Sequence, residues 1–541
     1  MFFSDLPIEL QIQIILLLDV GLIISCRSAC RHMCAIIDDS VAVQYRLELC
    51  AAGMVDGTYT PGLSISDRLN SLREYEKAWL SAPFTYHPLL RAAVNDPDHC
   101  EDWWPTTGGT IPYTSKGALR LFRPPSLSRG VVGKTWCFPS TVVEVEDAVE
   151  ICIDPEQDLM VLPKWSEGQG GRVLKCHLLS IELKGTPHPM ATQPLLCSGP
   201  HRLASASSSS RVHILGDLLG CTVDSDRCMM VFNWKTGHVV WRFHSSGAPR
   251  FHLLDSYTLV LFERYSIRLY IFDPAVTEDI PCDSQPDEHC VLALPPLVES
   301  NPILSCDEAH LTPTAYADCG PIFFPSPSSS FLVVTYHIYS IHTTLAFRAA
   351  GHRHPTKWTH LLMLIPIRTL LNQSVRASQR PDTCLDSTPI ISWDDWGPHG
   401  TRCLLLDNDP KDISAIGSKC VLYFPRYGSD GGMADILIID ARPWVHLAPS
   451  YRKYHNISAP YLLKPSTYDK CQLFASPLHS TLPYRVLHRE IRLGSDLSSA
   501  STMLLEDGLA ISRSLRSYPQ PGDAPEDGHW PMDVGFDILL T

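Results

Sequence analysis

The chain has 541 residues, of which 45% are hydrophobic and 19% are charged. This balance is typical of an ordered globular protein and excludes a disordered chain, and the length predicts two to four domains. The net charge of −14 disfavours general nucleic-acid or anionic-membrane binding, because either partner would need a basic face.

The first fifty residues are dominated by short apolar helices. Pro7 suits the start of a helix, because its missing N–H needs no partner there. Aliphatic residues then recur every four positions from Leu6 to Leu18. Three short helices in about forty residues cannot bury this much aliphatic surface among themselves, so the excess predicts a surface for a partner.

This segment resembles the F-box. The residues that carry the resemblance are Leu-Pro-x-Glu-Leu at 6–10, Leu18-Asp19, Leu22, Cys30-Arg31 and Ile-Asp-Asp-Ser at 37–40. The resemblance implies a three-helix module at residues 1–50 that binds a Skp-type adaptor and, through the adaptor, a cullin. It implies that six residues carry the adaptor contact: Leu6, Pro7, Glu9, Ile14, Leu18 and Leu22.

The apolar run at 12–24 does not have the features of a membrane or secretion signal. It is too short to span a bilayer and contains Asp19, and no Lys or Arg precedes it. The 19 cysteines show no Cys-x-x-Cys pair and no disulfide framework. We therefore expect a reduced protein of the cytoplasm or nucleus, with no membrane partner.

Residues 51–83 are expected to form a helical linker. Ser64 and Asp67 have the spacing of a capping box, and apolar residues recur on one face from Leu69 to Trp79. Trp79 is expected to anchor this helix to the domain that follows.

From about residue 84 the helical periodicity gives way to short apolar segments separated by turn residues. Such a pattern favours a sandwich, barrel or propeller, and roughly 400 residues fit a propeller of ~40–50 residues per blade. The segment 231–238 resembles the end of a WD-type blade, although Phe232 and Asn233 replace the usual Trp-Asp. We expect an all-β domain at 84–518 with seven or eight blades, followed by an irregular tail at 519–541.

The chain beyond the F-box is also similar to a large group of basidiomycete-type fungal F-box proteins. The segments that carry this similarity are 68–79, 154–159, 393–402 and 484–486. The similarity implies a β-rich, propeller-like C-terminal region with no known common substrate.

The chain carries no complete catalytic or ligand-binding motif. Residues 133–135 read Gly-Lys-Thr, but Ser128 stands where a phosphate loop needs its first Gly. Cys26, Cys30 and Cys34 could face one ion, although packing as small core residues is the favoured interpretation. We therefore expect no catalytic residues, no cofactor and no metal.

Trp393, Trp396 and Arg402 have two interpretations. The favoured one is packing at a blade junction, with Arg402 paired to a neighbouring Asp. The alternative is a target-binding loop, because Trp and Arg are enriched among the residues that dominate protein interfaces.

Three hypotheses for function follow from these patterns. The first is a substrate receptor of a Skp–cullin–F-box ubiquitin ligase, with the β domain holding an unknown target protein. The second is an F-box interaction scaffold outside any ligase. The third is a propeller enzyme, which would need polar residues that converge on a central pocket.

Overall fold

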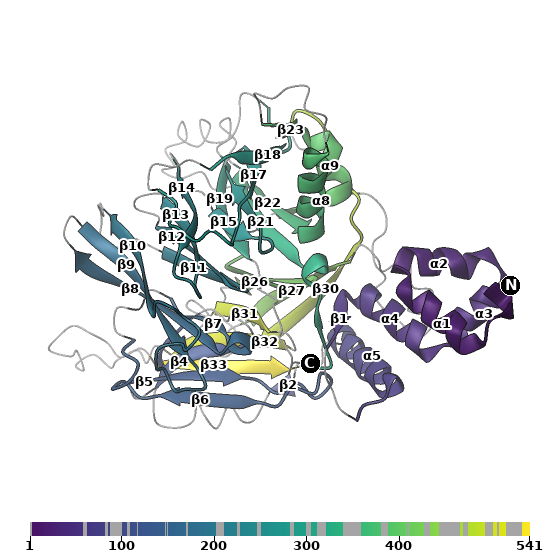
Figure 1. Cartoon of the computed structure of the whole chain (residues 1–541), viewed down its shortest axis with the longest axis horizontal. Coiled ribbons are helices and arrows are strands. Elements are labelled where there is room, and N and C mark those ends of the chain that lie inside the picture. The colour runs from purple at the N-terminus through teal and green to yellow at the C-terminus, as the bar shows by residue number, and fades with distance from the viewer. Residues whose placement is uncertain are drawn as a thin grey trace.

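The computed structural model shows a group of N-terminal helices attached to the side of a ring of β-sheets (Figure 1). The residues that it describes are 3–57, 62–81, 85–86, 100–104, 109–115, 117–145, 148, 150–168, 171–201, 210–223, 228–245, 250–263, 265–281, 286–298, 304–310, 321–338, 359–379, 388–406, 408, 410–426, 433–442, 466–468, 474–492, 501–505, 508–515 and 533–540. No helix within these residues is both long and apolar enough to cross a membrane.

The first helices form one compact unit, residues 3–52, which we call the helical module. Its elements are η1 (Phe3–Asp5), α1 (Ile8–Leu17), α2 (Val20–Ala29), α3 (Arg31–Asp39) and α4 (Val41–Ala52). Side chains cap the N-termini of three of these helices. Asp19 accepts from the Leu22 N–H at 2.9 Å, Cys30 Sγ accepts from the Met33 N–H at 3.5 Å, and Ser40 accepts from the Val43 N–H at 3.4 Å. Gly53, with φ of 67°, ends α4 in the left-handed conformation that glycine adopts most easily.

The core of the module draws on all four α-helices, so the compact unit has one helix more than the predicted three. Its fully buried side chains are Ile15, Ile23, Ile36, Ile37, Val43 and Leu47. The last two belong to α4, which therefore packs within the module and also continues into the linker.

The linker consists of β1 (Met54–Asp56) and α5 (Ile65–Ser81). The predicted capping box is confirmed, because the Asp67 N–H donates to Ser64 Oγ and the Ser64 N–H donates to Asp67 Oδ2, both at 3.1 Å. β1 pairs antiparallel with β20 (Phe323–Pro325), which ties the linker to a segment far along the chain.

Six antiparallel sheets follow one another around a ring in the described part of the chain, and we number them blades 1–6. Blade 1 is β7 (Cys152–Asp154), β8 (Leu159–Gly168), β9 (Gly171–Ser180) and β10 (Leu195–His201). Blade 2 is β11 (Ser210–Leu215), β12 (Leu218–Val223), β13 (Cys228–Asn233) and β14 (Val239–His244). Blade 3 is β15 (Arg250–Leu253), β16 (Thr258–Phe262), β17 (Ser266–Ile271) and β18 (Glu288–Ala293), with β23 (Ile390–Ile391) beside β18.

The remaining blades include strands from both ends of the chain. Blade 4 is β19 (Leu304–His310), β21 (Phe331–Ile338), β22 (Thr359–Pro366) and β24 (Arg402–Leu406). Blade 5 is β25 (Asp412–Ile416), β26 (Lys419–Arg426), β27 (Met433–Ala441) and β30 (Tyr484–Arg492). Blade 6 is β31 (Ser501–Leu505), β32 (Gly508–Leu515), β33 (Asp533–Leu540), β3 (Cys100–Trp103), β4 (Ile111–Ser115), β5 (Ala118–Arg123) and β6 (Lys134–Phe138).

Small elements connect or flank these blades. They are β2 (Thr85–Tyr86), which pairs with β33, the hairpin of β28 (Ser466–Tyr468) and β29 (Leu478–Ser480), η2 (Pro155–Gln157) and η3 (Pro327–Ser329).

Hydrophobic clusters between neighbouring blades close the ring. Separate clusters join blades 1 and 2, 2 and 3, 3 and 4, 4 and 5, and 5 and 6. A further cluster brings Leu119 and Leu121 of β5 against Ile153 of β7, and so joins blade 6 back to blade 1. Because each blade is covered on both faces, the fold is a closed six-bladed β-propeller.

The prediction of seven or eight blades is wrong in number, although the propeller itself is confirmed. Dividing the length by an average blade assumes that every residue belongs to a blade. Blade 4 instead contains α8 (Ile367–Ser378) and α9 (Trp393–Gly400) between β22 and β24, and the sheet of blade 6 has eight strands once β2 is included. The β domain is therefore not all-β.

One boundary also differs from the prediction. The predicted tail at 519–541 is irregular, but β33 lies inside blade 6 and pairs with β32 along its whole length. Strands β4 and β5 lie within the span that is expected to be rich in strands. All five residues of β4 are buried, so β4 has no alternation of buried and exposed positions, whereas β5 alternates over its first four residues.

Candidate docking surface and its attachment to the propeller

The outer side of the helical module exposes large aliphatic side chains. On α1, the exposed fractions are 53% for Ile8, 39% for Ile14 and 83% for Leu17, and Leu10 is exposed between them. Leu22 of α2 is also exposed, at 50%. A free helical bundle gains nothing from presenting such residues to water, so this face has the composition of a protein-docking surface.

The six residues predicted to contact an adaptor lie in or beside this face. Pro7, Glu9, Ile14 and Leu22 are exposed, whereas Leu6 and Leu18 are half-buried. The module positions them through Gln11, which is buried and whose side-chain amide donates to the Leu6 carbonyl at 2.7 Å. The resemblance did not place Ile8, Leu10 or Leu17 among the adaptor-contact residues, although Leu10 belongs to its motif and all three are aliphatic residues of the same helix.

We call the opposite side, formed by α4 of the module together with β1 and α5 of the linker, the inner face. It also carries apolar residues, but they are buried against blades 5 and 6. The residues from the helices and the linker are Tyr45, Leu49, Ala52, Met54, Leu69, Leu72, Tyr75 and Trp79. They meet strands of both blades, for example at Val421 of β26 and Leu509 of β32. The predicted role of Trp79 as an anchor is thus confirmed, with 1% of the residue exposed.

A group of charged side chains is buried beneath α5, and sequence analysis did not find it. Arg442 donates to the Glu76 carboxylate at 2.6 and 3.1 Å and to Asp440 Oδ1 at 2.8 Å. Asp440 also accepts from Arg485 at 2.6 Å, and Lys419 lies 5.2 Å from the Tyr75 and Trp79 rings. We call Glu76, Lys419, Asp440, Arg442 and Arg485 the buried charge cluster.

The cluster holds its carboxylates ionised. Burial alone would raise the pKa of Glu76 and of Asp440, but Arg442 and the neighbouring cations outweigh burial and lower both pKa values. For Lys419 burial dominates, with further repulsion from Arg442, and lowers its pKa to about 8. Since charges this deep must be paired, the contact of Glu76 with Arg442 specifies how α5 is seated on blade 5.

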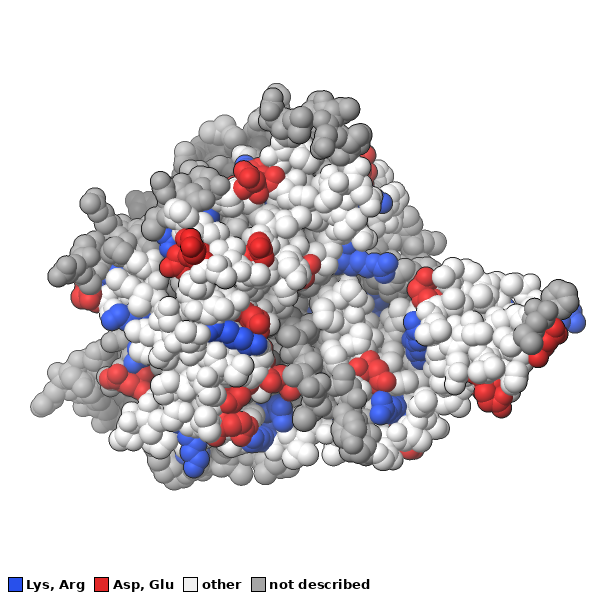
Figure 2. Space-filling view, in the orientation of Figure 1, with Lys and Arg blue, Asp and Glu red and all other residues white. Residues whose placement is uncertain are grey.

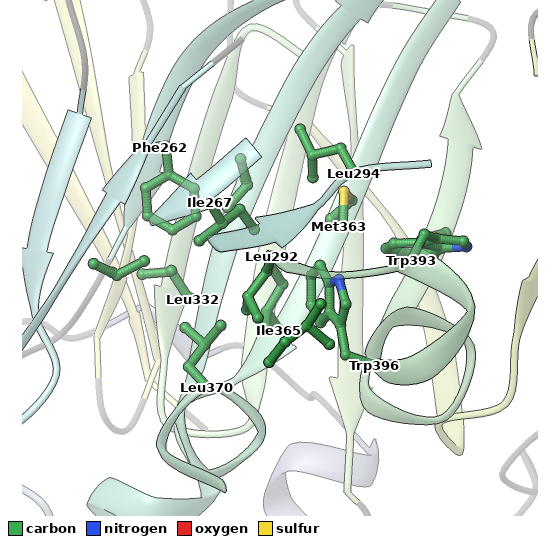
Figure 3. Close-up of a cluster of buried hydrophobic side chains, with 14 of the residues drawn as sticks. Phe262, Ile267, Leu292, Leu294, Leu332, Met363, Ile365, Leu370, Trp393 and Trp396 are labelled. Carbon is green, nitrogen blue, oxygen red and sulfur yellow. The ribbon is translucent and has the colours of Figure 1, made fainter. Parts of the chain in front are cut away.

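Trp393, Trp396 and Arg402 lie in the interior of the propeller, where Figure 3 shows the two Trp side chains at the edge of a hydrophobic cluster. Both indoles are nearly inaccessible, and Trp396 donates from Nε1 to the Ala293 carbonyl at 2.9 Å. Arg402 is fully buried and donates to the carbonyls of Leu482 and Ser480 at 2.8 and 3.0 Å. These positions agree with packing, not with the alternative target-binding loop. The favoured interpretation pairs Arg402 with a neighbouring Asp, and the contacts described for its guanidinium include these two carbonyls.

Polar side chains in or beside the first strand of one blade accept hydrogen bonds from backbone N–H groups of the first strand of the next blade. Glu150, just before β7, accepts from the Val212 N–H of β11 at 2.9 Å. On the other side, Asp412 and Ser414 of β25 accept from the backbone of β31, each at 3.0 Å. Burial raises the pKa of Glu150 to about 7, and the Val212 N–H opposes that shift. These groups close the ring between blades.

One exposed group on blade 5 has the composition of a metal site, namely Asp435, His488 and Glu490. Arg426 donates to both carboxylates, at 2.5 Å to Asp435 Oδ1 and 2.7 Å to Glu490. His488 lies 2.7 Å from Asp435. The guanidinium already supplies the positive charge that these carboxylates need, so we interpret the group as a surface ion-pair network.

Comparison with known proteins identifies no family. No family model and no curated protein matches the chain. Among solved structures, BamB from Moraxella catarrhalis aligns with 81% of this chain and 96% of its own, at 10% identity and a TM-score of 0.31. The hydrazine synthase of Kuenenia stuttgartiensis aligns with 77% of this chain and 93% of its own, at 9% identity and a TM-score of 0.33. The AfRom2 CNH domain aligns with 82% of this chain and 94% of its own, at 8% identity and a TM-score of 0.31. Likeness at this level carries no argument about function.

Proposed function

We propose that the chain is a substrate receptor of a Skp–cullin–F-box ubiquitin ligase. The helical module would bind the Skp-type adaptor, and the propeller would hold a target protein. The receptor needs no catalytic residues of its own, because holding the target near a charged ubiquitin-conjugating enzyme raises the rate by proximity. It would act in the cytoplasm or nucleus, where such adaptors operate.

The observation that carries the proposal is the exposed aliphatic face of α1 and α2. It coincides with the segment that resembles the F-box, and four of the six residues implied by that resemblance are exposed. Burying a single Leu or Ile side chain contributes roughly 1.5–3 kcal/mol, so three or four of them contribute about 5–12 kcal/mol toward the cost of association. An adaptor groove that accepts an amphipathic helix would provide this burial.

The way in which the module is attached also supports a receptor role. The buried charge cluster and the apolar contacts of α5 hold the docking face in one orientation relative to the ring. A target bound to the propeller would then lie at a defined distance from the adaptor.

Thirteen cysteines of the described residues are free, and free thiols are typical of a reducing compartment.

Adaptor binding tests the proposal directly. The double substitution Ile14→Asp and Leu22→Asp places charges on the exposed face, and we expect it to weaken binding to a purified Skp-type adaptor at least about a hundredfold. The matched control is Leu183→Asp, because Leu183 is equally exposed, at 53%, but lies on the propeller. Surface plasmon resonance measures the affinities, and the melting temperature of each variant reports its fold.

Two results would overturn the adaptor assignment. One is an intact chain that shows no measurable affinity for the adaptor. The other is equal affinity of the wild type and the double variant. Replacing Leu6 and Pro7 together with Ala gives an independent version of the same test at the start of α1.

The non-ligase scaffold predicts the same adaptor binding, so a separate measurement distinguishes it. If the chain acts in a ligase, a cullin co-purifies with the adaptor-bound protein, and proteins found near it by proximity labelling accumulate when Ile14 and Leu22 are substituted. An adaptor complex that never contains a cullin would support the scaffold instead.

A further inference from the structure

A cavity of about 800 Å³ lies between the helical module and the propeller. The module contributes α1, α2 and α4 to its walls, the linker contributes β1 and the start of α5, and the propeller contributes η3 and the first turn of α8. Cavities of this size at the junction of two units are typical of sites for small molecules.

The apolar part of the wall is formed mainly by the module and the linker, through side chains such as Leu16, Leu49 and Ile65. The polar part includes three hydroxyl groups from one short segment of the propeller, Ser326, Ser328 and Ser329. The wall thus offers an apolar surface on one side and hydrogen-bonding groups on the other.

Two arginines bring positive charge to the cavity from opposite sides. Arg46 belongs to α4 of the module, and Arg368 belongs to the first turn of α8 on the propeller. Figure 2 shows basic side chains on both sides of the notch between the module and the ring. Within the described part of the chain, Arg46 has no carboxylate at salt-bridge distance.

Cys50 lines the same cavity as the two arginines. Burial raises the pKa of the Cys50 thiol, and Arg368 and Arg46 both oppose that shift. Two like charges that face each other across a cavity repel, and an anion placed between them would remove this repulsion.

The carboxylates in the wall are already engaged. Asp56 accepts from the Tyr45 hydroxyl at 2.7 Å and from Arg68 at 3.1 Å. Asp19 accepts from the Leu22 N–H at the start of α2. Arg46 and Arg368 therefore bring guanidinium groups to a wall whose carboxylates already accept hydrogen bonds.

We propose that this cavity binds a small molecule with an apolar body and a phosphate-type anionic group. The anion would lie between Arg46 and Arg368, with the serine hydroxyls of the 326–329 segment as further donors, and the apolar body would lie against the module. Guanidinium groups suit phosphate oxygens because they donate two parallel hydrogen bonds. The inference is independent of adaptor binding, since Ile14 and Leu22 do not line the cavity.

The probe for the experiment is 1-naphthyl phosphate, and 1-naphthol serves as its neutral counterpart. Isothermal titration calorimetry on the full chain should show one saturable site for 1-naphthyl phosphate and weaker binding of 1-naphthol. Arg46→Gln and Arg368→Gln should each weaken binding of the phosphate about tenfold, because each loses a charge-assisted hydrogen bond. Arg46→Lys, which keeps the positive charge, should reduce the affinity for 1-naphthyl phosphate less than Arg46→Gln does.

The matched control is Arg376→Gln, because Arg376 is an exposed arginine of the same helix, two turns from Arg368, and does not line the cavity. It should leave the affinity unchanged, and all variants should melt at the wild-type temperature. The proposal is overturned if 1-naphthyl phosphate shows no saturable site, if 1-naphthol binds equally well, or if Arg376→Gln weakens binding as much as Arg368→Gln.

Discussion

The two sides of the helical module have similar apolar compositions and opposite environments. On the outer side, α1 and α2 expose Ile8, Ile14, Leu17 and Leu22 to solvent. On the inner side, the apolar residues of α4 and α5 are covered by blades 5 and 6, and a cluster of five charged residues is buried with them.

The difference shows that apolar periodicity marks a face for burial without identifying what covers it. The inner face packs against blades 5 and 6 of the same chain. The buried charges define one orientation of that contact. Within the residues that the structure describes, the outer face stays exposed to solvent. Four predictions, from the largest expected effect to the smallest, test this contrast.

Arg442→Ala should have the largest effect, because it removes a buried cation that pairs with both Glu76 and Asp440 and leaves their charges buried. We expect the free energy of unfolding to fall by about 3–5 kcal/mol. Urea denaturation followed by tryptophan fluorescence measures the change. Arg426→Ala removes an arginine from the exposed network on the same blade and should change stability little. Equal effects of the two substitutions would contradict the role assigned to the buried cluster.

Leu47→Ala and Leu17→Ala compare the same change on the two sides of the module. Leu47 is 2% exposed in α4, and Leu17 is 83% exposed in α1. Leu47→Ala should reduce the free energy of unfolding by about 2–5 kcal/mol through a cavity, whereas Leu17→Ala should change it by less than about 0.5 kcal/mol. The two variants should rank in the opposite order for adaptor affinity. Leu17→Ala should weaken adaptor binding directly, because Leu17 lies on the outer face, whereas Leu47→Ala should not. A strong loss of stability in Leu17→Ala would show that the outer face is not free.

Lys419→Met tests the buried cluster by pH. The pKa of Lys419 is lowered to about 8 from 10.5, so between these values the unfolded chain binds more protons than the folded one. The free energy of unfolding of the wild type should therefore rise with pH across this window, by about 1–3 kcal/mol relative to Lys419→Met. The variant should in turn be the more stable protein at pH 7. Denaturation curves at several pH values provide the comparison. Parallel pH profiles for the two proteins would argue against a lowered pKa of Lys419.

Gly53→Ala should have the smallest effect. Gly53 ends α4 at the point where the module passes into the linker, with φ of 67°. An alanine there meets Ser329 at an ordinary contact distance, so the cost is backbone strain of about 1 kcal/mol. Thermal denaturation should show a shift of a few degrees, and an unchanged melting temperature would mean that α4 can end without the left-handed residue.

Local signals in the sequence were sufficient for several elements. The capping box of Ser64 and Asp67 and the helix it begins follow from short-range spacing, and the structure has both. α8 was missed, although Ile367, Leu370 and Ala377 follow helical spacing after Pro366. The expectation of uninterrupted strands masked that signal. Strands buried on both faces, such as β4, lack alternation and left no pattern to find.

Pairs that are distant in sequence were beyond such reasoning. Glu76 and Arg442 are 366 positions apart, and nothing near either residue indicates the other. Blade 6 joins Cys100 to Val534, so its extent depends on both ends of the chain. The interior positions of Trp393 and Trp396 likewise depend on blades 3 and 4 packing around α9.

By itself, the sequence determined the helical module, the linker helix, the β-propeller class and the surplus of aliphatic residues at the N-terminus. All of these are local, because periodicity and capping act over a few residues. Only the tertiary structure decided the blade number, which apolar face is covered, and where charges are buried. Those outcomes depend on contacts between distant segments, whose free energies arise when the ring closes and the module is seated on it.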